Sequence, residues 1–225
     1  MCNLYDIGPA PRRRRYDWES ELIEILGETV NVAPGRSGVV AVADDSSPTS
    51  ARPIAARMHW GYRRTFRTGG KPIPRQVNNA RDDKLEGRMW ADSFENRRCV
   101  IPAIQFYEWS GPKGKKTKHA IRAVDEETAG SEGKVAGDDD GEAWFWIAGI
   151  WEDDFETTDR RSYSMITTSS PEAMVELHDR TPCLLLPDDV EEYLFSDEPP
   201  RHLVRPYPGK LSINPPLMVD GMLHF

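Results

Sequence analysis

The sequence contains little cysteine and no long apolar run. Its three cysteines in 225 residues, Cys2, Cys99 and Cys183, lie far apart. They form neither a disulfide framework nor a Cys/His cluster typical of zinc sites. No apolar stretch approaches the roughly 18 residues that span a bilayer, and the start lacks the features of a signal peptide. We therefore expect a cytoplasmic protein without a metal or other cofactor and without a membrane partner.

Positive charge is in the minority, yet it is concentrated in one part of the chain. The net charge is −8, but residues 51–122 hold 17 Lys/Arg against 6 Asp/Glu, whereas residues 123–199 hold 4 against 22. The basic segment also carries Trp60, Tyr62 and Phe66, and aromatic residues among cations are typical of single-strand binding surfaces. Composition alone fits a solvated basic face better than a phosphate-binding one, so both interpretations stay open.

The chain predicts one domain over residues 1–225, because no Gly/Ser-rich or Pro-rich linker separates two hydrophobic patterns. Residues 125–142 are acidic and rich in glycine, which predicts a disordered insertion without a catalytic role. The Pro-rich segment 199–225 predicts an irregular tail.

Hydrophobic periodicity and turn residues predict the elements between these segments. Helices are expected over 16–26 and 82–96, in a short segment capped by Ser170, and after a cap at Asp188. Strands are expected over 30–32, 38–43, 55–62, 99–109, 119–124, 144–151 and 161–169. Residues 44–52 are read as a polar loop and 63–76 as an irregular basic loop.

Cys2 follows the initiator methionine, and this position offers a chemistry that internal cysteines lack. If Met1 is removed, Cys2 carries a free α-amine two carbons from its thiol, and this 1,2-aminothiol condenses with an aldehyde to a thiazolidine ring. The amine has an ordinary pKa of about 7.7–8.0 and the thiol of about 8.5, so both are close to nucleophilic at neutral pH. A lone cysteine is more often a small buried hydrophobe, which is how we interpret Cys99 and Cys183.

Glu108 and His178 are two further polar residues in unusual surroundings. Strand alternation over 99–109 places Glu108 on the same face as Ile104 and Phe106. Burying an unpaired carboxylate is costly, so Glu108 is either ion-paired to an arginine at the strand end or functional. His178, in His-Asp-Arg-Thr-Pro, is either part of a capping network or a positioned acid/base.

Five short motifs occur together along the chain. They are Cys2, Asn-Ala-Arg at 79–81, Phe-Tyr-Glu-Trp at 106–109, Ile-Ala-Gly-Ile-Trp-Glu at 147–152 and His-Asp-Arg-Thr-Pro at 178–182. In this combination the chain resembles the SOS response-associated peptidase family, whose members shield abasic sites in single-stranded DNA. The resemblance runs from Cys2 to about Pro187. It implies an α+β fold with a curved, mostly antiparallel, barrel-like β-sheet flanked by short helices.

The resemblance also implies a covalent chemistry centred on Cys2. Met1 would be removed autocatalytically, and Cys2 would then attack the ring-opened aldehyde of an abasic deoxyribose, giving a thiazolidine DNA–protein crosslink. Asn79 would orient the Cys2 amine or a sugar oxygen. Glu108 would move a proton at the amine and assist removal of Met1, and His178 would protonate the sugar ring oxygen. Lyase activity is a further expectation.

The same resemblance implies a set of DNA contacts. Arg81 would bind a phosphate next to the lesion. Phe66 would stack on flanking bases, and Pro34 and Thr167 would line the DNA channel. The expected partner is single-stranded DNA containing abasic sites, bound by a monomer at the nucleoid.

The chain departs from the family pattern in three places. Many relatives begin Cys-Gly-Arg, whereas this chain reads Cys2-Asn3-Leu4. The phosphate contact of that arginine is therefore either lost or supplied by another cation, with Arg63, Arg64 and Arg67 as the candidates. The segment between Trp60 and Asn79 is longer than in relatives. The region after Pro208 lacks the Asn-rich closing motif that is expected there.

Two other functions fit part of the pattern. One is a thiol N-terminal-nucleophile peptidase or amidohydrolase, with Cys2 attacking a carbonyl and Glu108 and His178 as acid/base. The other is a single-strand or chromatin-associated binding module in which Cys2 is incidental. The basic segment favours DNA over a peptide or small amide as the substrate.

Overall fold

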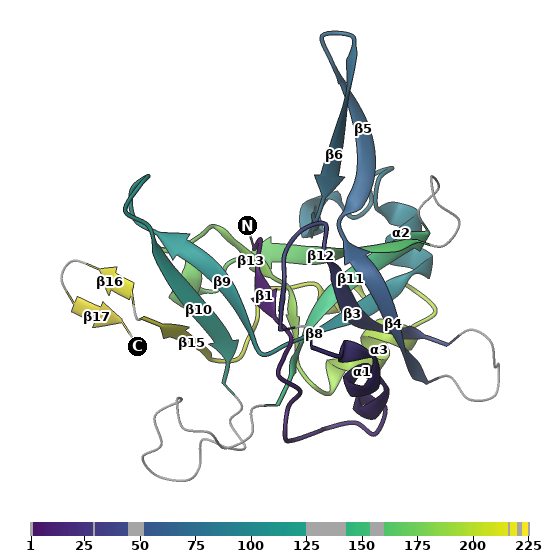
Figure 1. The fold of residues 1–225 in the computed structure, drawn as a ribbon, viewed down its shortest axis with the longest axis horizontal. Coiled ribbons are helices and arrows are strands. Elements are labelled where there is room, and N and C mark those ends of the chain that lie inside the picture. The colour runs from purple at the N-terminus through teal and green to yellow at the C-terminus, as the bar shows by residue number, and fades with distance from the viewer. Residues whose placement is uncertain are drawn as a thin grey trace.

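Strands of the computed structural model build two larger sheets and a projecting hairpin (Figure 1). The structure describes residues 2–224 except 29, 45–51, 125–142, 154–159, 216, 220 and 221. The helices are α1 (Glu19–Leu26), α2 (Ala91–Asn96) and α3 (Asp189–Phe195), with short 3₁₀ turns η1 (Asp82–Lys84), η2 (Glu172–Met174) and η3 (Arg201–Leu203). The strands are β1 (Tyr5–Asp6), β2 (Asn31–Val32), β3 (Ser37–Ala43), β4 (Pro53–Trp60), β5 (Tyr62–Thr68), β6 (Lys71–Val77), β7 (Asn79–Arg81), β8 (Arg98–Ala103), β9 (Gln105–Ser110), β10 (Thr117–Ala123), β11 (Phe145–Asp153), β12 (Arg161–Ser169), β13 (Arg180–Pro182), β14 (Leu184–Leu185), β15 (Leu211–Asn214), β16 (Leu217–Val219) and β17 (Met222–His224).

The larger sheet is curled and barrel-like, as the fold class predicted. Its strands follow the order β13-β12-β4-β3-β8-β11-β14, and β12 pairs with β11 as well as with β4. Most pairings are antiparallel, whereas β12 runs parallel to β4 and β7. Strand β11 is apolar on both faces because it is central: it pairs with β8, β12 and β14. The helices α1 and α3 pack against this sheet.

The second sheet contains β1 and so places the N-terminal residues beside β9. Its order is β15-β10-β9-β1-β2, so β1 lies between β9 and β2. The chain passes from the larger sheet to this one at Ile104, whose amide donates to the Asp6 carbonyl at 2.8 Å. The single strand predicted over 99–109 is therefore wrong: it is β8 and β9, in two different sheets.

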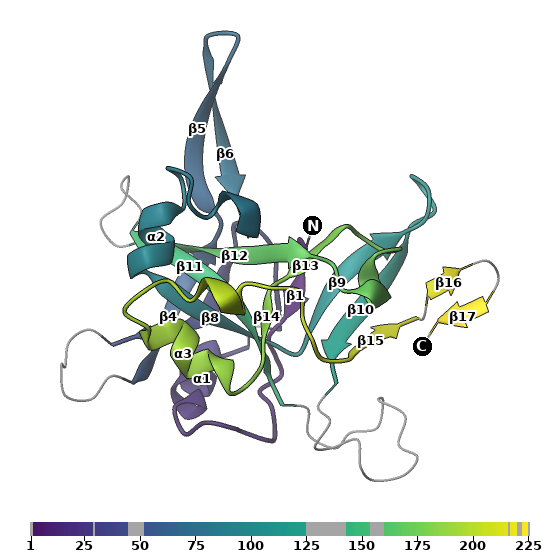
Figure 2. The ribbon, with the colours of Figure 1, turned by 180° about the vertical axis from the view of Figure 1, so that it is seen from behind.

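The segment predicted as an irregular basic loop is a regular hairpin. Strands β5 and β6 pair from Tyr62↔Val77 to Thr68↔Lys71 around Gly69-Gly70. These two glycines have φ of 57° and 80°, and positive φ at both positions defines the type I′ turn that suits a two-residue hairpin. The hairpin projects from the body in Figures 1 and 2. Its two prolines, Pro72 and Pro74, are opposite Arg67 and Thr65.

Other expectations had mixed outcomes. The predicted helix over 82–96 is interrupted around Gly87, leaving only η1 and α2, because glycine disfavours a continuous helix. The first helix begins at Glu19 rather than at residue 16. Ser170 does not cap a helix, since its hydroxyl donates to the His178 carbonyl at 2.6 Å. The tail is not wholly irregular, because β15 pairs with β10. The acidic segment 125–142 and most of the predicted polar loop 44–52 lie outside the described residues.

The core contains the internal cysteines, as predicted: Cys99 and Cys183 are fully buried. Among the described residues, no helix combines the length and apolar character needed to cross a membrane.

Candidate active site

The pairing of β1 with β9 brings the N-terminal residues beside Glu108. Tyr5 is opposite Phe106 in the register, and the Tyr107 amide donates to the Leu4 carbonyl at 3.0 Å. Continuing β1 backwards from Leu4 therefore takes the chain along the end of β9 that carries Glu108. Figures 1 and 2 both place β1 between two projecting parts, the hairpin β5–β6 and the β9–β10 arm.

Cys2 is fully buried in this arrangement. Its Sγ donates to the Leu4 carbonyl at 3.3 Å. Burial raises the pKa of the Cys2 thiol from 9.0 to about 12, and the nearby Glu108 carboxylate adds to the shift because it repels a thiolate. At neutral pH the thiol is protonated here, so it needs a base before it can act as a nucleophile.

Asn79 holds the Cys2 backbone. It begins β7, which is fixed by parallel pairing with β12 (Met165↔Asn79). Its side-chain Nδ2 donates to the Cys2 carbonyl at 3.0 Å. Its Oδ1 is buried without a hydrogen-bond partner among the described residues. A buried amide oxygen in this state is an acceptor available to a ligand or to an amine.

Glu108 lies on the buried face of β9, where the alternation predicted it. The side chain is in the interior, with only 4% of the residue exposed. Burial raises the pKa of Glu108 above its ordinary 4.5, whereas the neighbouring His178, when protonated, acts in the opposite direction. Glu108 thus interacts electrostatically with both Cys2 and His178.

His178 lies in the connection between η2 and β13. Its Nδ1 accepts the Arg180 amide at 2.9 Å, and the exposed Asp179 carboxylate is 2.8 Å from the same nitrogen. One nitrogen cannot both accept the amide and donate to the carboxylate. The amide hydrogen is fixed by the backbone, so we assign Nδ1 as the acceptor, which leaves the proton of the neutral ring on Nε2. In this form Nε2–H can donate a hydrogen bond to a ligand.

Arg81 is exposed at the end of β7, and its guanidinium group is already paired with a carboxylate. The Nε and Nη2 atoms donate to the two carboxylate oxygens of Asp83 at 2.9 and 3.0 Å. This bidentate pairing is the geometry in which arginine also binds phosphate.

The three remaining predicted DNA contacts have different surroundings. Phe66 is exposed on β5. Pro34 is half-buried in the turn between β2 and β3. Thr167 is fully buried, and its carbonyl accepts from Arg180, so its side chain lines no surface in this structure.

Comparison with known proteins identifies the family. Residues 1–215 match the model of the family described as SOS response associated peptidase (SRAP). The chain belongs to this family.

Curated relatives of this SRAP protein are distant and longer. It is 29% identical over 161 residues to "Abasic site processing protein HMCES" of Xenopus tropicalis, which covers 67% of this chain and 48% of that protein. It is 26% identical over 169 residues to "Abasic site processing protein YoaM" of Bacillus subtilis (strain 168), covering 73% of this chain and 64% of that protein. The chain therefore spans about half to two thirds of the length of these relatives.

Solved structures share the fold. A protein from Bacteroides thetaiotaomicron has a TM-score of 0.65 at 19% identity, with 94% of this chain and 90% of that one covered. A protein from Bordetella bronchiseptica has a TM-score of 0.64 at 16% identity, covering 94% and 98%.

Two residues at the SRAP site were missed by the sequence reasoning, Asn3 and Asn78. The Asn78 Nδ2 donates to Asn3 Oδ1 at 3.1 Å and lies 3.5 Å from the Cys2 carbonyl. Asn3 thereby ties the N-terminal segment to the residue that precedes β7. The adjacent asparagines Asn78 and Asn79 could have indicated a role for Asn78, but the sequence does not show which of the two side chains contacts Cys2.

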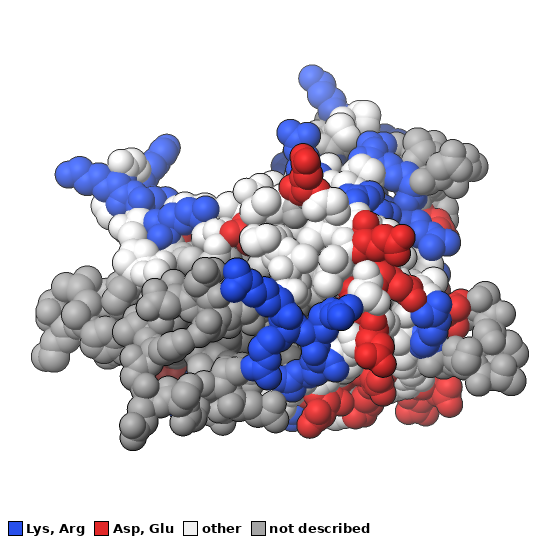
Figure 3. Space-filling view, turned by 60° about the horizontal axis from the view of Figure 1, so that its bottom comes forward, with Lys and Arg blue, Asp and Glu red and all other residues white. Residues whose placement is uncertain are grey.

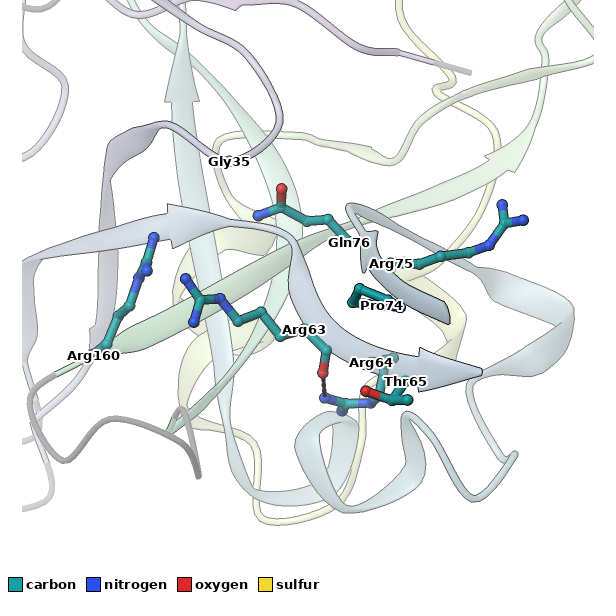
Figure 4. Close-up of a pocket in the computed structure, with 8 residues that line it drawn as sticks. All are labelled: Gly35, Arg63, Arg64, Thr65, Pro74, Arg75, Gln76 and Arg160. Atoms are coloured by element: carbon teal, nitrogen blue, oxygen red, sulfur yellow. Dashed lines mark hydrogen bonds between the residues drawn. The ribbon is translucent and has the colours of Figure 1, made fainter. Parts of the chain in front are cut away.

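The arginine missing after Cys2 has three candidate replacements on the hairpin, and they are not equivalent. Arg64 forms a bidentate ion pair with the buried Glu152, with both distances 2.6 Å, so its charge is compensated. Arg67 is exposed further along β5. Arg63 lines a pocket at the base of the hairpin (Figure 4).

Proposed function

We propose that this protein forms a covalent crosslink with abasic sites in single-stranded DNA through Cys2, after autocatalytic removal of Met1. The observation that carries the proposal is the convergence of the buried Cys2, Asn79 and Glu108 with the partly exposed His178, all from separate parts of the chain. The names of the relatives, abasic site processing proteins, support the choice of substrate.

The proposed reaction has a defined order. Hydrolysis of the Met1–Cys2 bond frees the Cys2 amine, and this amine attacks the aldehyde of the ring-opened sugar. The buried thiol, with its pKa of about 12, is the poorer first nucleophile. Loss of the aldehyde oxygen as water gives an imine, and the thiol then adds to the imine carbon. One C–N and one C–S bond form and one water leaves, so no oxidant or reductant is needed.

Glu108, Asn79 and His178 have separate tasks in this series of reaction steps. Glu108, with a raised pKa, takes a proton from the Cys2 ammonium or thiol and returns it during loss of water. Asn79 fixes the Cys2 carbonyl, and its Oδ1 is available to orient the freed amine. His178, when both ring nitrogens carry a proton, donates its Nε2 proton to the sugar ring oxygen and is left as the neutral ring. Protonation of this oxygen favours the open aldehyde.

Covalent capture on denaturing gels tests the proposal. Protein lacking Met1, verified by intact mass, should shift an oligonucleotide with one abasic site and leave the same oligonucleotide with an intact base unshifted. The Cys2→Ser variant keeps the amine but should yield only a labile imine, which borohydride traps. Absence of any adduct from the processed wild type contradicts the proposal. Turnover of an amide substrate without a DNA adduct would support the peptidase alternative instead.

A further inference from the structure

Ser110 and His119 form a hydrogen-bonded pair that has no role in the proposed crosslinking. Ser110 ends β9 and is half-buried, whereas His119 lies on β10 with 3% of the residue exposed. The Ser110 Oγ and the His119 Nε2 are 2.7 Å apart. The other ring nitrogen, Nδ1, is 2.6 Å from the Pro215 carbonyl oxygen. A hydroxyl, an imidazole and a backbone carbonyl are thus joined in one chain of hydrogen bonds.

The pairing of three neighbouring strands brings these groups together. In the second sheet β10 lies between β9 and β15, as Figures 1 and 2 both show. In the β9–β10 register His119 is opposite Glu108, two residues before Ser110, so Ser110 and His119 are diagonal neighbours on one face of the sheet. On the other side of β10, the last residue of β15, Asn214, pairs one residue after His119, and the Pro215 carbonyl follows beside the ring.

The hydrogen bonds fix which nitrogen of His119 carries the proton of the neutral ring. A backbone carbonyl can only accept, so Nδ1 carries the hydrogen and donates it to Pro215. Nε2 is then an acceptor, and the hydrogen between it and Ser110 belongs to the hydroxyl. His119 is therefore in the tautomer of a general base, and the proton that it accepts is that of Ser110.

This geometry matches the arrangement that activates a nucleophile. A serine hydroxyl is a weak nucleophile unless a base takes its proton during attack. The diagnostic signature is a nucleophile within hydrogen-bond reach of a base that a third group orients. Ser110, His119 and the Pro215 carbonyl meet this description at 2.7 and 2.6 Å. The base is buried, whereas the serine is partly exposed, as contact with a substrate requires.

We propose that Ser110 is a second nucleophile of this protein, activated by His119, and that it accepts acyl groups from activated carboxylic esters. The inference does not rest on the proposed function, because it involves neither Cys2 nor DNA.

The proposed reaction has two steps. First, Ser110 Oγ bonds to the ester carbonyl carbon, its proton passes to His119 Nε2, and the bond to the leaving alcohol breaks as that proton moves to the alcohol oxygen. Second, His119 takes a proton from water, the water oxygen replaces Ser110 on the carbonyl carbon, and Ser110 recovers the proton. The products are an acid and an alcohol, so water is the one co-reactant.

Labelling of the intact chain with a fluorophosphonate tests the assignment. An activated serine displaces fluoride from this reagent and keeps the phosphonyl group, so peptide mass spectrometry should find the label on Ser110. The Ser110→Ala variant should lose this label. In His119→Gln the rate of labelling at Ser110 should fall on the order of a hundredfold, because glutamine cannot take the proton.

Two matched controls separate activation by a base from ordinary surface reactivity. Ser196 is also partly exposed, but its hydroxyl donates to the Glu192 carbonyl and not to a base. It should stay unlabelled in the wild type. His202 is an exposed histidine that pairs with a carboxylate, and His202→Gln should leave the labelling of Ser110 unchanged.

Reaction with p-nitrophenyl acetate gives a second readout. A short reaction should leave an acetyl group on Ser110, and incubation without the ester should regenerate the free serine. If His119→Gln does not fold, Ser110→Ala still tests the inference, because it removes a single hydroxyl from the end of a strand. The part of the ester hydrolysis that depends on Ser110 should be lost in this variant.

Any of three results would overturn the inference. One is a wild-type protein that carries no label on Ser110, which would leave the pair as a structural link between β9, β10 and the tail. Another is labelling of His119→Gln at the wild-type rate with an unchanged melting temperature. The third is labelling of Ser196 as fast as that of Ser110. A protein that is labelled on Ser110 but forms no adduct with abasic DNA would instead reject the proposed function alone.

Discussion

Glu108 is a carboxylate that the fold holds in an unfavourable place. It lies on the buried face of β9 next to Phe106, and burial raises its pKa. A charged group in such a position lowers stability, and its retention is understandable if the proton is used in the reaction. The strand alternation located this residue from sequence because period-two geometry needs no knowledge of the partner strands.

The stability of a Glu108→Gln variant should depend on pH in a defined direction. The folded chain binds this proton more tightly than the unfolded chain, so the contribution of Glu108 to stability is fully present below its ordinary pKa of 4.5 and is lost as pH rises through the raised value. The neutral variant should therefore melt at a higher temperature than wild type at about pH 8. The difference should shrink toward pH 4.5.

The same variant should crosslink abasic DNA more slowly, on the order of a hundredfold, because it lacks the base. Glu95→Gln, which changes an exposed carboxylate, is the control in both measurements. A pH-independent stability difference would contradict the assignment of a buried titrating carboxylate.

Asp83 occupies the Arg81 guanidinium group that is proposed to bind a DNA phosphate. The two-point pair occupies the fork that is proposed to bind phosphate, and it raises the pKa of Arg81 and lowers that of Asp83. A phosphate must therefore displace the Asp83 carboxylate. The Asn-Ala-Arg motif indicated Arg81, but the sequence alone did not show that its fork was already in use.

Removal of the competing carboxylate should strengthen DNA binding. For Asp83→Asn we expect an affinity for single-stranded DNA about two- to fivefold higher, the size of effect that an exposed ion pair produces. In an Arg81→Ala background the same substitution should have no effect, and this double-mutant cycle isolates the pair. Asp92→Asn is the control, since Asp92 is an exposed carboxylate paired with another arginine, Arg97. Equal gains in both backgrounds would show a general charge effect.

The β5–β6 hairpin is the element that the sequence reasoning described least well. The glycines and prolines of residues 63–76 predict an irregular loop, yet Gly69-Gly70 forms a hairpin turn because both glycines adopt positive φ. The error arose because the strands carry arginines in place of alternating apolar residues. A two-stranded ribbon with no buried face has no hydrophobic period to read.

Phe66 is the exposed aromatic residue of this hairpin, opposite Ile73. Stacking of one base on an aromatic ring is worth about 1–3 kcal/mol, so Phe66→Ala should weaken single-strand binding by about five- to 150-fold. Thermal stability should be unchanged, because the ring is not part of the core. Val175→Ala removes an exposed apolar side chain from η2's C-terminal side and serves as the control. Unaltered DNA affinity measured by fluorescence anisotropy would exclude a stacking role.

The break between β8 and β9 is a second feature that the sequence pattern did not predict. The sequence from Cys99 to Trp109 is mostly apolar and contains no glycine, so its pattern predicts one strand. The change of sheet at Ile104 depends on pairing with β1, a partner almost 100 residues earlier that leaves no local signal. By contrast, β12 matched its predicted range because both of its ends are marked by polar residues.

At the scale of the whole molecule, charges of both signs share the surface. Figure 3 shows Lys and Arg side chains at the projecting parts and in a cluster at the lower centre, with Asp and Glu side chains mainly on the right and along the lower edge. The net charge of −8 therefore does not describe the local potential at any one place on the surface. Segment counts from the sequence show that basic residues concentrate in 51–122, whereas the pocket lined by Arg63 and Arg160 needs the fold, since these residues are far apart in the chain.

Replacement of residues 125–142 by a short Gly/Ser linker tests the expectation that the acidic insertion has no catalytic role. The segment holds eight Asp/Glu and one Lys. At about 0.15 M salt, repulsion beyond roughly 8 Å is screened, so the crosslinking rate should stay within about twofold of wild type. A large loss of crosslinking with an unchanged melting temperature would assign the segment a direct part in DNA capture.

The positions of Pro72 and Pro74 protect the open edge of the hairpin. Both lie two residues apart on β6, so their missing amide hydrogens fall on the same edge of the strand, and β6 pairs with β5 alone among the described strands. The Gly69-Gly70 turn makes the flanking Thr68 and Lys71 the hydrogen-bonded pair, which directs residues 72 and 74 toward the open edge. An unprotected open edge is a template for strands of other molecules. With two amide donors missing from this edge, the projecting hairpin is a poor template for strand addition by a second copy of the chain.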